Sequence, residues 1–326
     1  MARYLLKRTL NYVILLFVAV TIVYFLAASQ LNPLALQDIT NPNRDWDSIY
    51  SALADKNLSP RTPLIERYWT WLRDVIRWDW GVSPSGGSVN EAISAKVWVS
   101  VRLVTVGFVV GAVVGVIVGA WTATRQYKAS DRAVTLGSLV VLSTPVPVIA
   151  VVLQISAIWI NRKTGWNLFE FTGETGRHSG TWISPFLDRL QHLLLPTIGL
   201  ALTQIAFFSR YQRNLMLDTL GADYVRTAQA KGLSRRRAVF KHGLRTALIP
   251  TGTLFAFQVA TIFVGATFTE TLFGWHGMGE YFIQSLLNQD VHGTVAVAAF
   301  SGVCVMVGAI ASELFVVVLD PRVRVS

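Results

Sequence analysis

Residues 99–123 read VSVRLVTVGFVVGAVVGVIVGAWTA, and this stretch decides the fold class. A helix needs about 20 apolar residues to cross a lipid bilayer, and this run is long enough to do so. The whole chain has the same character, because it is 52% hydrophobic and only 15% charged. Soluble domains typically carry about 25% charged residues. The sequence therefore predicts an all-α membrane protein that crosses the bilayer several times.

Glycine recurs at every fourth position inside this run, which places the glycines on one face of the helix. Such a face lets the backbone of a neighbouring helix approach closely. We expect it to pack against a helix of the same chain or against a second subunit, and in neither case to conduct solute. The glycines in question are Gly107, Gly111, Gly115 and Gly119.

Six membrane spans are predicted, and they divide the chain into regions. The predicted spans are residues 9–29, 99–123, 133–160, 191–216, 246–274 and 294–319. The regions are a cytoplasmic N-terminus with the first span (1–29), a long external segment (30–98), a core transmembrane domain (99–319) and a cytoplasmic tail (320–326). Pro145 and Pro147 fall inside the third span and Pro196 inside the fourth, where they predict kinks.

Positive charge predicts the orientation, because Lys and Arg concentrate in loops on the cytoplasmic side of a membrane. The chain carries 29 Lys and Arg against 19 Asp and Glu, a net charge of +10. Placing both termini in the cytoplasm puts most of this charge inside, including the run Arg235–Arg237. Tryptophan favours membrane interfaces, and every tryptophan except Trp121 falls near an external end. We therefore expect a multi-pass protein of the cell membrane, whose basicity reflects topology and not nucleic-acid binding.

The sequence offers no motif for catalysis or for binding a nucleotide or a metal. Its five histidines are not paired at metal-ligand spacing, and neither G-x-x-x-x-G-K-[ST] nor H-E-x-x-H occurs. Cys304 is the one cysteine, so a disulfide within the chain is impossible. We expect that the chain is not an enzyme and binds no metal or cofactor of its own.

Polar residues inside the predicted spans are candidates for a solute pathway. Gln154, Gln204 and Gln258 are mid-span amides, which either line a pathway or form hydrogen bonds between helices. Glu313 lies near the inner end of the sixth span and Arg102 near the outer end of the second. An ionisable group inside a membrane is a functional candidate by default. Both residues are close enough to an interface to reach water or an ionic partner instead.

The segment between the fourth and fifth spans has more structure than a turn requires. Residues 222–231 suit a short helix that stops at Gly232, and Ser234 can cap a second helix over 235–242. The basic side chains here either set the topology and contact anionic lipid or belong to a docking surface for a cytosolic partner. The small apolar surface that this segment would offer consists of Val225, Ala228 and Leu233.

This segment resembles the coupling loop of ABC importer permeases. Residues 226–232, R-T-A-Q-A-K-G, are similar to the family's E-A-A-x-x-x-G pattern, with Arg226 in place of Glu. The longer string D-Y-V-R-T-A-x-A-K-G-L is similar to the variant in the B-type permease subunit of peptide importers. The motifs W-D-W-G-V-S (78–83), W-H-G-M-G-E (275–280) and D-P-R-V-R (320–324) extend the resemblance over nearly the whole chain.

The resemblance implies the fold of a type I ABC importer permease, with six transmembrane helices and a long external segment between the first two. It implies a pathway for ATP-driven uptake of oligopeptides or dipeptides, formed as a heterodimer with a homologous second permease. Two cytosolic ABC ATPase subunits, or one fused ATPase chain, would bind ATP and Mg²⁺, and an external substrate-binding protein would deliver the peptide. The residues that it assigns to ATPase coupling, within the loop 222–242, are Val225, Arg226, Thr227, Ala228, Ala230, Lys231, Gly232 and Leu233.

Other functions are open alternatives. The cargo could be a nickel chelate or glutathione in place of a peptide. An ATP-independent carrier would leave the structured loop 222–242 without a role. A membrane-embedded enzyme would need catalytic groups clustered at one depth, and the histidines and intramembrane acids of this sequence do not cluster.

Overall fold

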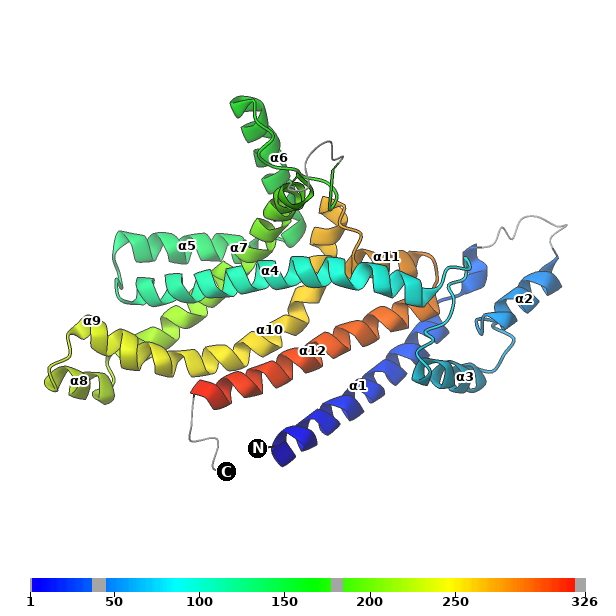
Figure 1. The fold of residues 1–326 in the computed structure, drawn as a ribbon, viewed down its shortest axis with the longest axis horizontal. Coiled ribbons are helices and arrows are strands. Elements are labelled where there is room, and N and C mark those ends of the chain that lie inside the picture. Colours follow the sequence, from blue (N-terminus) through cyan, green and yellow to red (C-terminus); the bar gives the residue numbers. More distant parts are fainter. Residues whose placement is uncertain (1, 37–44, 177–183, 320–326) are drawn as a thin grey trace. The chain divides into compact units, whose positions relative to one another are not determined.

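The structure, a computed structural model, describes residues 2–36, 45–176 and 184–319. Within these ranges the regular elements are all helices, joined by turns, and Figure 1 shows their order. The all-α prediction is therefore confirmed. The predicted cytoplasmic tail, residues 320–326, lies outside the described residues.

The chain forms two compact units, and each is described by itself. The first unit comprises residues 1–101 and 276–306, and the second comprises residues 102–275 and 307–326. The helices of the first unit are α1 (Ala2–Gln30), η1 (Pro33–Leu36), α2 (Trp46–Asp55), α3 (Leu64–Ile76), the start of α4 (Val89–Ala123), α11 (Met278–Leu287) and most of α12 (Val291–Leu319). The helices of the second unit are the rest of α4, α5 (Ala129–Ser143), α6 (Val146–Thr164), α7 (Ser184–Leu220), α8 (Asp223–Ala230), α9 (Arg235–Ala238), η2 (Val239–Gly243), α10 (Leu244–Phe273) and the end of α12.

Aromatic side chains hold α3 of the first unit against α1. Tyr24 of α1 is buried between Tyr68 and Trp71 of α3, with ring centroids 5.4 and 4.7 Å apart. The hydroxyl groups of Thr21 and Tyr68 share a hydrogen bond of 2.9 Å. Aromatic pairs at such distances contribute about 0.5–1.5 kcal/mol beyond the area that they bury. Part of the predicted external segment is thus packed on the first apolar helix.

The quoted run 99–123 is the second part of a longer helix, because α4 begins already at Val89 and has 35 residues. The Ser88 hydroxyl accepts a hydrogen bond from the Glu91 amide at 3.4 Å, as expected of a residue that caps a helix start. A helix of this length spans about 50 Å and exceeds the roughly 30 Å of a hydrocarbon core. The predicted span is correct as a helix, and the helix start that the capping-box pattern of residues 88–91 predicts belongs to the same continuous helix.

The predicted third span, 133–160, is not one helix. It is divided into α5 and α6 at Thr144, whose backbone is extended (φ −93°, ψ 126°). Proline disfavours helical backbone in the residue before it, and Pro145 follows Thr144 directly. Pro147 lies in the first turn of α6, where a missing amide hydrogen costs nothing. The two prolines therefore end one helix and start the next, in place of kinking a single one.

Helix α7 is the centre of the second unit and packs against α5, α6 and α10.

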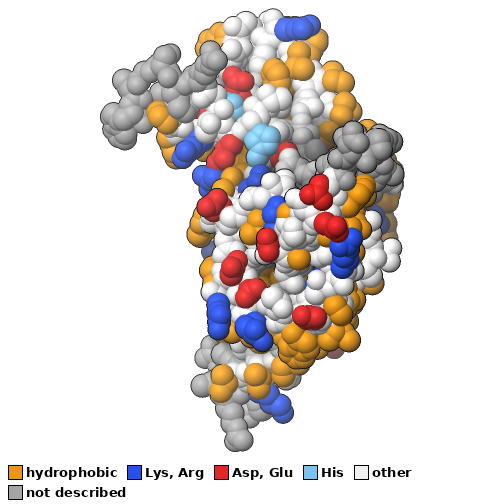
Figure 2. Space-filling model, turned by 90° about the vertical axis from the view of Figure 1, so that its right-hand side faces the viewer, with side chains coloured by type: hydrophobic (Ala, Val, Ile, Leu, Met, Phe, Trp, Pro, Cys, Tyr) orange, Lys and Arg blue, Asp and Glu red, His pale blue; other side chains and the backbone are white. Residues whose placement is uncertain are grey.

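By length and composition, five helical segments among the described residues are able to cross a membrane: Leu6–Gln30, Val89–Ala123, Val146–Thr164, Pro185–Leu220 and Val291–Ala311. The predicted span 246–274 coincides with helix α10, which is not one of these five. The predicted count of six spans stays a prediction. On the face shown in Figure 2, acidic and basic side chains are interspersed among apolar ones.

Candidate functional site

The predicted coupling loop forms a compact helical turn between α7 and α10. Helix α8 ends at Ala230, and Gly232 follows with a left-handed backbone (φ +92°), which matches the predicted helix stop. Ser234 caps the next helix by accepting a hydrogen bond from the Arg237 amide at 3.4 Å. The predicted second helix, 235–242, is not separate. The four-residue α9 continues through the π-helical turn η2 into α10, with helical backbone at each junction.

The buried face of α8 fastens the loop to the rest of the unit. Val225 and Ala228 are buried, at 0% and 7% exposure, in a cluster with Met216 of α7 and Val239 of η2. The other buried members of this cluster are Ala120, Ala123, Ala238 and Ala247. Burying a valine side chain stabilises a fold by about 1.5–3 kcal/mol. Two of the three apolar residues expected to face a partner therefore face inward, and they tie α8 to the ends of α4, α7 and α10.

The outward face of the loop is small, polar and basic. Of the predicted coupling residues, Arg226, Thr227, Ala230, Lys231 and Gly232 are exposed and Leu233 is half-buried; Asp223 and Tyr224 of α8 are exposed as well. The Thr227 hydroxyl donates a hydrogen bond to the Asp223 carbonyl at 2.8 Å, so it is satisfied within α8. Arg226 lies 4.0 Å from the Asp223 carboxylate, and both side chains are exposed. Ala230 and Gly232 have small side chains, so another protein can approach the backbone here closely. Arg226 and Lys231 add positive charge to this surface.

A buried ion pair lies between α5 and α7. Arg213 donates two hydrogen bonds to the Asp131 carboxylate, at 2.6 and 2.8 Å, and the Tyr127 amide donates a third at 2.9 Å. The Asp131 side chain is 3% exposed and that of Arg213 is 19% exposed. The hydrogen bond from Arg213 is the main reason why the pKa of Asp131 lies below its usual range. No sequence pattern pointed to this pair, because the two residues are far apart in the chain.

The four glycines of α4 contact α7 of the same chain. A Cβ atom added at Gly107, Gly111 or Gly115 would lie 2.8, 2.5 or 2.8 Å from the Cβ atom of Leu200, Gln204 or Phe208, respectively. One added at Gly119 would collide with the Ser209 carbonyl oxygen. Real Cβ atoms do not come this close to other atoms. Of the two alternatives for this face, the structure shows packing within the chain.

The four pathway candidates are not brought together by described contacts. Gln154 in the middle of α6 donates hydrogen bonds to the carbonyl groups of Leu272, near the end of α10, at 2.8 Å and of Phe171, in the segment after α6, at 3.3 Å, so it connects α6 to both. Gln204 lies in the α4–α7 contact, where its half-buried side chain faces Gly111. Gln258 of α10 and Glu313 of α12 are also half-buried. Arg102, the other intramembrane charge, forms an ion pair with Glu174.

Comparison with known proteins assigns the chain to a family. The family model described as "Binding-protein-dependent transport system inner membrane component" matches residues 115–325, which include the whole of the helical loop just described. The chain belongs to this family. Its apolar helices and its family together make it a multi-pass membrane protein.

Three relatives of this permease illustrate how far the similarity extends. The oligopeptide transport system permease protein OppB of Mycobacterium tuberculosis (strain ATCC 25618 / H37Rv) is 46% identical over 328 residues, which cover 100% of both chains. The dipeptide transport system permease protein DppB of Bacillus subtilis (strain 168) is 32% identical and covers 80% of both chains. The oligopeptide transport system permease protein AppB of the same organism is 29% identical, over 99% of this chain and 100% of its own.

Proposed function

We propose that this chain is a permease subunit of an ABC importer that takes up oligopeptides or dipeptides. The observation that carries the proposal is an exposed surface made by Arg226, Thr227 and Ala230 of α8 and by Lys231 and Gly232 directly after it, while the other side of α8 is packed on the chain. An exposed surface on a helix that is packed firmly against its own chain is suited to dock a partner. A permease without an ATPase of its own needs such a surface, because the ATPase has to bind to it. Full-length relatives that are named for peptide transport support the cargo.

The orientation and the partners are part of this proposal. Both termini lie in the cytoplasm, and α8 therefore faces the cytosol, in accord with the positive charge of its loop. A cytosolic ABC ATPase docks on α8, and the ATP and Mg²⁺ are bound by the two ATPase domains, whether they are two chains or one. A homologous second permease completes the pathway as a heterodimer, and an external binding protein delivers the peptide. The partner subunits hydrolyse ATP. Their movement makes this chain open the pathway to one side of the membrane or to the other.

The packing of α8 explains how a cytosolic movement reaches the membrane helices. Val225 and Ala228 lie in one cluster with residues from the ends of α4, α7 and α10. A close-packed cluster transmits displacement because it cannot be compressed. When two ATPases close on ATP, α8 moves with them and takes these three helix ends along. Tilting of α7 and α10 then exchanges inward for outward access.

Enlarging Ala230 is expected to break the ATPase contact without unfolding the permease. Ala230 is exposed at the end of α8, so the Ala230→Trp side chain has room to extend into solvent and fills the docking surface. We expect at least about a tenfold loss of co-purifying ATPase, since a misfit of about 1.4 kcal/mol already lowers affinity tenfold. The measurement is the ratio of ATPase to permease after purification from native membranes, together with ATP-dependent peptide uptake.

Ala129→Trp is the matched control, because Ala129 is also exposed and opens α5. It should retain the ATPase and the uptake. Full peptide uptake by a preparation that lacks every ATPase would contradict the proposal and favour an independent carrier. Competition by a nickel chelate or glutathione, but not by peptides, would keep the importer class and replace the cargo.

A further inference from the structure

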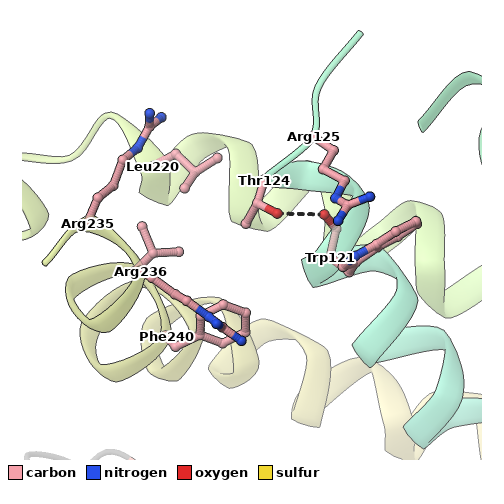
Figure 3. A pocket seen from close by; sticks show the side chains of 8 residues that line it. Trp121, Thr124, Arg125, Leu220, Arg235, Arg236 and Phe240 are labelled. Atoms are coloured by element: carbon pink, nitrogen blue, oxygen red, sulfur yellow. Dashed lines mark hydrogen bonds between the residues drawn. The ribbon is translucent and has the colours of Figure 1, made fainter. Parts of the chain in front are cut away.

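An open pocket of about 490 Å³ lies beside the coupling loop in the second unit. It is lined by Trp121, Thr124, Arg125, Leu220, Arg235, Arg236, Val239 and Phe240. Figure 3 shows Trp121 at the end of α4 and Arg125 in the turn after it on one side of the pocket, with Arg236 and Phe240 on the other. The volume falls in the range of small-molecule sites, which is about 300–1,000 Å³. None of these residues except Leu220 and Val239 serves the packing of α8.

The charge of this pocket is of one sign. Arg125, Arg235 and Arg236 contribute three guanidinium groups, and no acidic residue is among the described residues that line it. None of the three arginines has an ion-pair partner in the part of the chain that the structure describes. Arginine binds phosphate well, because its planar fork donates parallel hydrogen bonds to two oxygens. The pocket is therefore suited to a phosphate-bearing anion.

The aromatic and apolar lining places this anion at a membrane surface. Trp121 ends the apolar run of α4 and is 38% exposed, and the Arg125 guanidinium lies 4.5 Å from the centre of its ring. Leu220 and Val239 add aliphatic surface, and Phe240 adds an exposed ring. Tryptophan favours the level of the lipid headgroups. This is also the one tryptophan that the sequence places away from the external ends, so the pocket gives it a role.

We propose that this pocket binds the phosphate headgroup of an anionic phospholipid, such as phosphatidylglycerol, in the cytoplasmic leaflet. Arg125, Arg235 and Arg236 supply the positive charge around the headgroup, and the apolar lining meets the glycerol and the start of the acyl chains. Basic pockets at the cytoplasmic ends of membrane helices suit anionic headgroups. The proposal rests on the cytoplasmic orientation given above. A soluble phosphate would gain nothing from Trp121 and Phe240, and an acidic protein surface would not need a pocket beside apolar side chains.

The site has a consequence for the coupling loop. Arg235 and Arg236 open the helix that follows Gly232, and Val239 belongs both to the pocket and to the cluster under α8. A lipid held between them and Arg125 joins the end of α4 to this helix. Anionic lipid should therefore stabilise the loop in the position from which it docks its partner.

The test uses the complete transporter complex in nanodiscs and a photoactivatable phosphatidylglycerol. We expect crosslinks to map to residues 121–125 and 235–240, and phosphatidylglycerol to compete about tenfold better than phosphatidylcholine. The triple variant Arg125→Gln/Arg235→Gln/Arg236→Gln should lower crosslinking at least about tenfold, because charge-assisted contacts to phosphate are lost. The control Lys128→Gln/Arg237→Gln/Lys241→Gln removes equal charge from exposed residues outside the pocket. It should lower crosslinking no more than about twofold, as expected of non-specific attraction.

Other outcomes overturn the proposal. Equal losses of crosslinking in the two triple variants would show that the lipid is attracted by the positive charge of the surface in general and not by the pocket. Protection by millimolar inorganic phosphate or ATP, with no difference between the two lipids, would assign it to a soluble anion. A pocket variant that loses the ATPase but keeps its lipid crosslinks would assign it to the partner protein.

Folding and function are read separately. The Arg→Lys triple variant keeps the charge but not the paired hydrogen bonds, so its crosslinking should lie between that of the wild type and that of the Arg→Gln variant. Crosslinking as low as in the Arg→Gln variant, at an unchanged melting temperature, would contradict a contribution of the charge. Crosslinking is measured without transport. A complex that binds the lipid but imports no peptide therefore contradicts the proposed function and leaves this site standing.

Discussion

Replacing Gly111 with leucine is expected to separate α4 from α7 and to destabilise the chain. A Cβ atom at this position would lie 2.5 Å from Gln204 Cβ, 2.9 Å from the Ala201 carbonyl oxygen and 3.0 Å from Ala201 Cα. The backbone atoms of Ala201 cannot rotate away, so the helices have to move apart. Overpacking typically costs about 1–3 kcal/mol, and contacts with backbone bring this case to at least the upper end.

The measurement is the thermal unfolding of the purified chain in detergent. At about 2–4 °C for each kcal/mol, the melting temperature should fall on the order of 5–10 °C. Gly111→Ala adds the Cβ atom alone and should give a smaller fall in the same direction. Gly137→Leu on α5 is the control, because an added Cβ there meets no atom within 4 Å. Destabilisation that appears only in the assembled heterodimer, and not in the isolated chain, would assign the glycine face to the second subunit.

The sequence was sufficient for the parts of the fold that depend on local signals. Gly232 ended α8 where its left-handed backbone requires, and the run of apolar residues located the helix of 99–123. The capping-box pattern of Ser88 and Glu91 predicts the helix start at residue 89. Its continuity with the span 99–123 was not predicted, because the first turns carry polar residues that lower the apolar signal although the helix continues. The break at Thr144 was missed because two prolines are compatible with a kink as well as with an end.

The candidate site was predicted in part, and the missing part is three-dimensional. The loop and its exposed residues follow from the pattern of 226–232. The pattern does not predict which way Val225 and Ala228 face. The same amphipathic sequence is compatible with an apolar face turned toward its own chain or toward a partner. The structure decides this through the facing residues Met216 and Val239. The pocket at Trp121 had one signal, a tryptophan at the unexpected end of a span, but its arginines come from separate elements.

The contact between Asp131 and Arg213 had no signal of this kind, and its removal is the second change with a large expected effect. Arg213→Met leaves the Asp131 carboxylate buried with the Tyr127 amide as its remaining hydrogen-bond donor among the described contacts. Breaking a buried ion pair from one side costs about 3–5 kcal/mol. Arg210→Met is the matched control, since Arg210 lies one turn away on α7 and is exposed, and it should change stability by less than about 0.5 kcal/mol.

The double variant Asp131→Asn/Arg213→Met distinguishes an unpaired charge from lost packing. It removes both charges, and the side-chain oxygen of the amide introduced at position 131 can still accept from the Tyr127 amide, so most of the stability should return. Equal losses in the single and the double variant would show that Arg213 acts through packing and not through its charge.

The pH dependence of unfolding gives an independent measure of this ion pair. The folded-state pKa of Asp131 is lowered from its ordinary value of 3.8, mainly by the hydrogen bond from Arg213. The unfolded chain therefore binds this proton first, and the stability that the pair contributes is complete above the unfolded value. It is lost as the pH falls below 3.8 toward the folded pKa. The wild-type chain should lose stability over this acid range, whereas the double variant, which has no carboxylate at position 131, should lack this part of the loss. Superimposable acid profiles of the two proteins would mean that the pair contributes no net free energy to folding.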